Sequence, residues 1–207
     1  SVITGSIAAV PVGAHARKAP TPPMHVSLLA DGLQGSVGAT IGPDGALYVP
    51  EAELGQITRI DPTTGNATTF ATGLPPQVIP LGGAIDVAFV GSTMYVLVTV
   101  VGPDVEGNSV VGIYRKDGSG AFSVFADLGT WSIDHPPATA FDLLDGVQFA
   151  LQPVPDGFLV SDGHHNRVLH VSLPGEITER MQSPNIVPTG RLVSRGTVFI
   201  AEARPGR

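Results

Sequence analysis

The side chains best suited to chemistry gather in the connection between residues 129 and 146. This segment carries carboxylates and an imidazole beside the only tryptophan of the chain. Such groups exchange protons and bind ligands, and long connections in compact domains are often functional. The alternative is a lid without chemistry, stiffened by Pro136 and Pro137. The candidate ligand-binding residues of this segment are Trp131, His135, Asp142 and Asp145.

A second group of candidates is the adjacent pair His164 and His165. An imidazole pair can bind a metal ion or shuttle protons near neutral pH. Because neighbouring residues usually point in different directions, the alternative is a pair exposed on a loop. We keep both histidines as ligand-binding candidates and expect the exposed arrangement.

These residues are positioned by a repeated phrase, in which an apolar strand ends on an acidic residue. Three copies and a fourth that lacks the acid occupy residues 47–52, 158–163, 198–203 and 94–98. The equivalent positions are 47, 64 and 40 residues apart, at Tyr48, Tyr95, Leu159 and Phe199. Spacing of this order is typical of stacked or radially arranged units, so we predict a repeat protein.

The repeated acid, at Glu51, Asp162 and Glu202, invites a calcium interpretation, because carboxylates grouped on one face can bind Ca²⁺. Asp162, however, precedes Asn166 and Arg167 at a spacing where an acid accepts hydrogen bonds from a turn or an arginine. A catalytic residue is needed once, whereas a residue that holds a turn is needed in every repeat. We therefore interpret the repeated acid as structural and predict no metal site.

The start of each predicted inner strand carries a small or polar residue among mostly apolar neighbours. These residues are Gly38, Asp86, Gln148 and Gly190. They either face a hydrated channel, where backbones approach closely, or contact a ligand. Asp86 and Gln148 complete the set of candidate ligand-binding residues.

The composition excludes several classes of function. With 43% apolar and 14% charged residues, the chain of 207 residues is globular rather than disordered. Its 11 basic and 18 acidic residues give a net charge of −7, so we expect no nucleic acid partner. No apolar stretch is long enough for a membrane span. The absence of cysteine excludes disulfides and thiolate metal sites.

Turns rich in glycine and proline divide the chain into short strands, and no sustained helical periodicity is present. Three units of four strands are predicted, at residues 38–41, 46–49, 56–61 and 67–71, at 85–90, 93–98, 109–116 and 122–126, and at 147–152, 157–161, 167–172 and 177–181. A fourth unit begins at Arg191 and stops after two strands. The prediction is an all-β fold, a partial β-propeller of four-stranded antiparallel blades with about three and a half blades present.

The incomplete fourth unit leaves an open blade edge. Either further blades follow in a longer protein, or self-association through this edge completes the ring. At the other end, Val2 to Val12 is apolar and is followed by Ala14-His15-Ala16, the form of a signal-peptidase site. We predict a signal-peptide remnant and linker at residues 1–25, a partial β-propeller domain at residues 26–207, and a secreted or periplasmic location.

Several phrases resemble those of the ScyD/ScyE family of exported bacterial propellers, within the wider NHL-like and regucalcin/gluconolactonase-like group. The phrases lie at residues 42–49, 58–65, 86–97 and 159–169, and the resemblance covers most of residues 26–203. It implies a full ring of six or a similar number of blades and a chain longer than this one. The family is linked by name to the scytonemin pigment pathway, and its biochemical role is poorly defined.

The leading hypothesis is an exported propeller that binds a small molecule or protein partner at the loop-rich mouth of its channel. The alternative, from a different class, is a metal-dependent hydrolase or lactonase that uses Asp86, Asp145 and His135. The sequence contains no G-x-S-x-G, P-loop or H-E-x-x-H motif, and we expect no cofactor. A third hypothesis is a structural role in assembly through exposed sheet edges.

Overall fold

The computed structural model describes residues 26–118, 120–139, 142–183, 187–194 and 197–203. The predicted signal segment and linker, residues 1–25, lie outside these ranges, so export stays a prediction. Among the described residues, no helix is long and apolar enough to cross a membrane.

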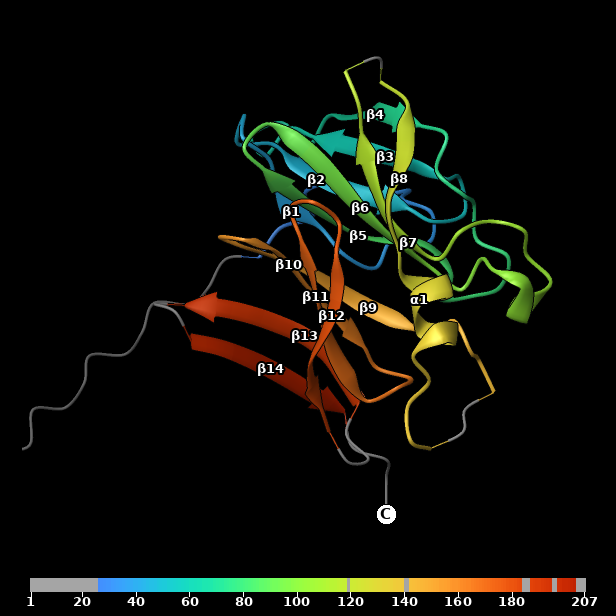
Figure 1. The fold of residues 1–207 in the computed structure, drawn as a ribbon. Helices are drawn as coiled ribbons and strands as arrows, with labels where there is room; N and C mark the ends of the chain where they lie inside the picture. The colour runs from blue at the N-terminus through green and yellow to red at the C-terminus, as the bar shows by residue number, and fades with distance from the viewer. Residues whose placement is uncertain (1–25, 119, 140–141, 184–186, 195–196, 204–207) are drawn as a thin grey trace, which may run out of the picture.

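The described strands form three antiparallel sheets of four strands and one hairpin (Figure 1). The first sheet contains β1 (Thr40–Ile41), β2 (Leu47–Glu51), β3 (Gln56–Ile60) and β4 (Ala67–Thr72). The second contains β5 (Gly83–Val90), β6 (Thr93–Thr99), β7 (Gly112–Lys116) and β8 (Phe122–Asp127). The third contains β9 (Gln148–Val154), β10 (Gly157–Asp162), β11 (Arg167–Ser172) and β12 (Ile177–Gln182). The hairpin pairs β13 (Val187–Ser194) with β14 (Thr197–Ala203).

Within each sheet the strands follow chain order, so every strand pairs with its neighbour in the sequence. Successive sheets meet through their inner strands, because β2 contacts β5, β5 contacts β9 and β9 contacts β13. The sheets therefore fan outward from a common inner region, as Figure 1 shows. This arrangement brings the loops before each first strand and after each second strand to one end of the fan.

Several strand boundaries differ from the predicted ones, among them the starts of β1, β7 and β13. β1 starts at Thr40 rather than at residue 38, because the backbone at Gly38 approaches Asp86 closely: a Cβ on Gly38 would lie 2.6 Å from Asp86 Oδ1. β7 starts at Gly112 rather than at residue 109, after a loop that contains the 3₁₀ turn η1 (Pro103–Val105). β13 starts at Val187, before the predicted Arg191, and accommodates a bulge between Pro188 and Gly190.

One short helix, α1 (Leu128–Asp134), occupies the first half of the connection that carries most of the candidate residues. Asp127 caps its N-terminus, since the Asp127 carboxylate accepts hydrogen bonds from the backbone N–H and the hydroxyl of Thr130, both at 2.8 Å. The second half of the connection has no regular structure where it is described, and residues 140 and 141 lie outside the described ranges. The Asp127 cap therefore determines where the chain leaves β8 and begins α1.

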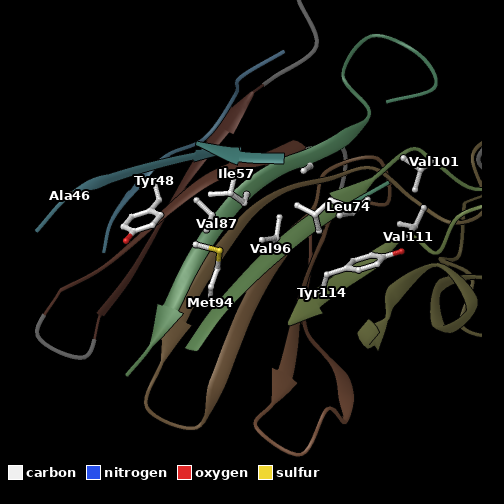
Figure 2. Close-up of a cluster of buried hydrophobic side chains, with 12 residues drawn as sticks. Ala46, Tyr48, Ile57, Leu74, Val87, Met94, Val96, Val101, Val111 and Tyr114 are labelled. Carbon is white, nitrogen blue, oxygen red and sulfur yellow. The ribbon is translucent and has the colours of Figure 1, made fainter. Parts of the chain in front are cut away.

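The hydrophobic core consists of two layers, one on each face of the second sheet. The period of two along β6 sends Met94, Val96 and Val98 toward the first sheet, and Tyr95 and Leu97 toward the third. Figure 2 shows the first layer, in which Tyr48 and Ile57 of the first sheet lie beside Val87, Met94 and Val96. Because both faces of the second sheet are buried, the first, second and third sheets pack face to face as successive layers.

Candidate functional site

A pocket of about 290 Å³ lies between the loop that carries η1, the start of α1 and the turn before β9. Three carboxylates line it, those of Asp104, Asp127 and Asp145, together with the apolar side chains of Val111 and Ile133. Asp145 is 4% exposed, and its backbone N–H donates to Asp104 Oδ2 at 3.1 Å. Two acidic side chains that are 41 residues apart in the sequence therefore meet at one wall of the pocket.

The environment of Asp145 disfavours its charged form. Burial, and then the negative charge and hydrogen bond of Asp104, raise the pKa of Asp145 from its ordinary value of 3.8 to about 6. Asp127 differs, because both of its oxygens already accept hydrogen bonds from Thr130 at the helix cap. Near pH 6 the carboxyl of Asp145 thus gains or loses its proton easily, which is a property of groups in many binding and acid–base sites.

Gln148 holds the turn that carries Asp145 against the second sheet. Its side-chain oxygen accepts a hydrogen bond from the Thr99 hydroxyl at 2.8 Å, and its backbone N–H donates to Thr99 Oγ1 at 3.1 Å. Its side-chain N–H₂ donates to the carbonyl of Asp145 at 3.0 Å. Gln148 is fully buried, so it positions the pocket wall rather than facing the open channel.

Asp86 lies apart from this pocket. Its Oδ2 accepts a hydrogen bond from the backbone N–H of Leu151 at 2.7 Å, which ties β5 to β9. Asp86 lines a separate pocket of about 220 Å³ beside β1, β5 and β9, together with Thr40 and Gln152. The residue therefore joins neighbouring sheets at the inner region.

The pair His164 and His165 does not form an exposed loop, and that part of the prediction is wrong. His165 is 1% exposed because the connection after α1 packs over it. Its Nε2 donates to the carbonyl of Leu143 at 3.1 Å, and its Nδ1 lies 2.9 Å from Asp162 Oδ2. His164 is partly buried, and this burial, followed by the charge of His165, lowers the pKa of His164.

Arg167 is the centre of a buried polar cluster, of which the sequence predicted only the contact with Asp162. Its Nε donates to Asp162 Oδ2 at 2.9 Å, and both side chains are fully buried. Its Nη1 donates to the backbone carbonyl of His135 at 2.8 Å, and its guanidinium lies 5.0 Å from the centre of the Trp131 ring. Arg167 therefore fastens α1 and the chain after it to the third sheet.

Asp162 accepts hydrogen bonds from Arg167 and from the turn between β10 and β11, which confirms the predicted structural role of this acid. Glu51 has the same role in the first sheet, where its carboxylate accepts hydrogen bonds from Gln34, Gln56 and Thr58. The side chain of Glu202 lies outside the described part of the structure.

Trp131 and His135 lie on consecutive turns of the same segment, with stacked rings whose centres are 4.4 Å apart. His135 Nδ1 donates to the carbonyl of Trp131 at 2.9 Å. Asp142 is exposed at the far end of the connection. The first half of the connection is therefore helical, and the ring of Trp131 packs against His135 and Arg167.

The three side chains proposed for a metal site, those of Asp86, Asp145 and His135, do not converge. Asp86 and Asp145 line different pockets, and His135 lines neither. Nowhere in the described ranges are three His, Asp or Glu side chains grouped so that they could hold a metal ion. The ligand set of the hydrolase hypothesis is therefore not assembled by the residues named for it.

Two residues that line pockets, Asp104 and Ser132, were not predicted as site residues from the sequence. Asp104 stands in Gly102-Pro103-Asp104, which ends an apolar run, and only the fold brings it to Asp145. Ser132 lies on α1 without any signal in the sequence. Arg167 was recognised as the partner of Asp162, but its contact with α1 was not.

No family model matches the chain, and no curated protein matches its sequence. Solved structures do match. Virginiamycin B lyase from Staphylococcus aureus has a TM-score of 0.55 and 16% identity, covering 82% of this chain and 49% of the lyase. A streptogramin B lyase has a TM-score of 0.54 and 14% identity, covering 82% and 48%. A putative gluconolactonase has a TM-score of 0.54 and 14% identity, covering 81% and 57%.

The fold is a β-propeller. The propeller neighbours and the four-stranded antiparallel sheets confirm the predicted all-β class and blade architecture. The chain spans about half the length of the lyases that it matches, as expected for a partial ring. At these identities the likeness concerns the fold alone, and the resemblance to ScyD/ScyE proteins stays a prediction.

Proposed function

We propose that this propeller binds a small organic cation at its mouth, in the pocket formed by the η1 loop, the start of α1 and the turn before β9. The observation that carries the proposal is the buried carboxyl of Asp145, which faces Asp104 across a pocket wall and has a pKa raised to about 6. An ammonium group placed between the two carboxylates would relieve their repulsion, donate hydrogen bonds to them and balance their charge in a desolvated setting.

The rest of the lining supports a cation with an apolar body. No lysine or arginine lines the pocket among the described residues, whereas three aspartates do. Val110, Val111 and Ile133 provide apolar surface beside the carboxylates. A volume of about 290 Å³ suits a small ligand, and pockets that combine apolar walls with a few polar groups are the usual form of small-molecule sites.

The pH dependence follows from the direction of the pKa shift. Below pH 6 Asp145 is mostly protonated and its negative charge is lost, whereas above pH 6 Asp145 is mostly ionised. The titratable groups around Asp145 are Asp104 on η1, Asp127 on the same pocket wall and His165 in the turn between β10 and β11. Binding of a cation should therefore strengthen as the pH rises through 6.

Benzylamine, which stays protonated between pH 5 and pH 8, provides the test. We expect it to bind about tenfold more tightly at pH 8 than at pH 5, because a charge-assisted hydrogen bond is lost when Asp145 is protonated. Asp145→Asn should weaken binding at pH 8 by a similar factor and remove the pH dependence. Isothermal titration calorimetry measures both quantities.

Two controls make this experiment specific. Benzyl alcohol has nearly the same shape without the charge, and its affinity should be independent of pH. Asp134→Asn changes an exposed aspartate of α1 that lies outside the pocket, and it should leave benzylamine binding unchanged. Equal binding of benzylamine by the protein and its Asp145→Asn variant at pH 8 would refute the proposal.

A hydrolase is the second candidate, favoured by the same pair of carboxyls. A protonated Asp145 beside a second carboxyl group, that of Asp104, resembles the acid–base pairs of enzymes that divide the two roles between two carboxyl groups. The cation-binding proposal predicts no hydrolysis of gluconolactone above the uncatalysed rate, with or without added Ca²⁺ or a chelator. Hydrolysis that is lost in Asp145→Asn, measured by proton release, would favour the hydrolase instead.

A further inference from the structure

A second pocket, of about 300 Å³, lies between the end of α1 and the chain that follows it. Its walls are mainly apolar, being formed by Ile133, Pro136, Pro137 and Leu144. It shares only Ile133 with the pocket of the carboxylate pair. The two cavities thus have different linings and different polarity.

Among the described residues of this second pocket, Ser132 carries the one buried side-chain polar atom without a hydrogen-bond partner. The residue is 0% exposed, and its hydroxyl has no hydrogen-bond partner among the residues that the structure describes. A serine within a helix commonly donates to the carbonyl four residues earlier, but this hydroxyl does not. Buried polar groups in folded proteins are nearly always paired, with protein, water or a ligand, so this hydroxyl requires an explanation.

Of the two other polar side chains of the lining, Thr139 is exposed and His165 is already engaged. Its Nε2 donates to the carbonyl of Leu143, and its Nδ1 lies within 3.0 Å of both Arg167 Nη2 and Asp162 Oδ2. The charge of Arg167 is balanced by Asp162 in the same buried cluster. The pocket therefore offers mainly apolar walls, the exposed hydroxyl of Thr139 and the buried hydroxyl of Ser132.

We infer that this pocket is a binding site for an uncharged, mainly apolar molecule that carries a carbonyl oxygen. The Ser132 hydroxyl donates to that oxygen, while the proline and leucine side chains contact the hydrocarbon part. A charged ligand does not fit, because it would lose its hydration without gaining a counter-ion. The inference is independent of the cation-binding proposal, since it concerns another cavity and another set of residues.

Cyclohexanone and methylenecyclohexane test the inference, because they differ by the exchange of a carbonyl for a methylene group at nearly equal shape. Binding to the 207-residue chain is followed by NMR, through the amide signals of Ser132 and Leu144. We expect cyclohexanone to bind more tightly than methylenecyclohexane. Ser132→Ala should weaken cyclohexanone binding by about tenfold and leave methylenecyclohexane binding unchanged.

The melting temperature of unliganded Ser132→Ala gives a second readout. Because the hydroxyl has no partner in the empty pocket, its removal should leave the melting temperature unchanged or raise it. Ser123→Ala, on the exposed part of β8, is the matched control and should alter neither affinity nor melting temperature. Absence of cyclohexanone binding, equal binding by the protein and Ser132→Ala, or a lowered melting temperature of Ser132→Ala that shows water as the partner would each overturn the inference.

Discussion

Replacing Arg167 with methionine will lower the free energy of unfolding by about 3–5 kcal/mol, which is the usual effect of breaking a buried ion pair by removal of one partner. Methionine keeps much of the side-chain length but leaves the carboxylate of Asp162, which is fully buried, without its guanidinium partner. It also removes the contact with Trp131 and the hydrogen bond to the carbonyl of His135. Urea unfolding measures the loss.

The fluorescence of Trp131 provides a local measurement of the effect of Arg167→Met. It is the only tryptophan of the chain, so its fluorescence should shift to longer wavelength in Arg167→Met as α1 loosens from the third sheet. Arg59→Met is the matched control, since Arg59 also pairs with an aspartate, Asp44, at 2.8 Å, but on the surface. Its effect on stability should be much smaller. Equal losses in the two variants would show that the Arg167 cluster does not hold α1.

Replacing Phe158 with alanine will lower the free energy of unfolding by about 3–5 kcal/mol. Phe158 is fully buried on β10, and its ring centre lies 4.7 Å from that of Tyr95 and 6.0 Å from that of Phe125 in the second sheet. Its removal opens a cavity in the layer that joins two blades. Thermal and urea unfolding measure the effect.

Phe70→Ala is the control for this substitution. Phe70 also makes an edge-to-face contact, with Tyr48, but it lies at the outer strand β4 and is 40% exposed. Because it buries less area, its truncation should cost clearly less than that of Phe158. If both variants lose the same stability, the packing between blades does not dominate the stability of this propeller.

The blades could be predicted because their signals are local. Many strands are short apolar runs, such as those at residues 47–49, 94–98 and 158–160, and the turn at 42–45 and the turn at 61–66 lie where strands must reverse. The structural role of Asp162 was also readable, since its partner Arg167 is five residues away. Local patterns thus determined the sheet architecture and the role of the repeated acid.

The site was predictable only in part, because its contacts cross between blades. Asp104 and Asp145 are far apart in the sequence, and their meeting depends on how the second sheet packs on the third. The burial of His165 depends on the chain after α1, which folds back over it. The seven-residue α1 is too short to show a clear helical period, although Asp127 is a typical cap.

The most direct test of the central claim is a crystal structure of the chain grown with benzylamine at pH 8. The account predicts the ammonium nitrogen within about 3 Å of carboxylate oxygens of Asp104 and Asp145, with the ring against Val111 and Ile133. Benzylamine bound only elsewhere on the propeller, or an unchanged pocket at saturating concentration, would contradict the account.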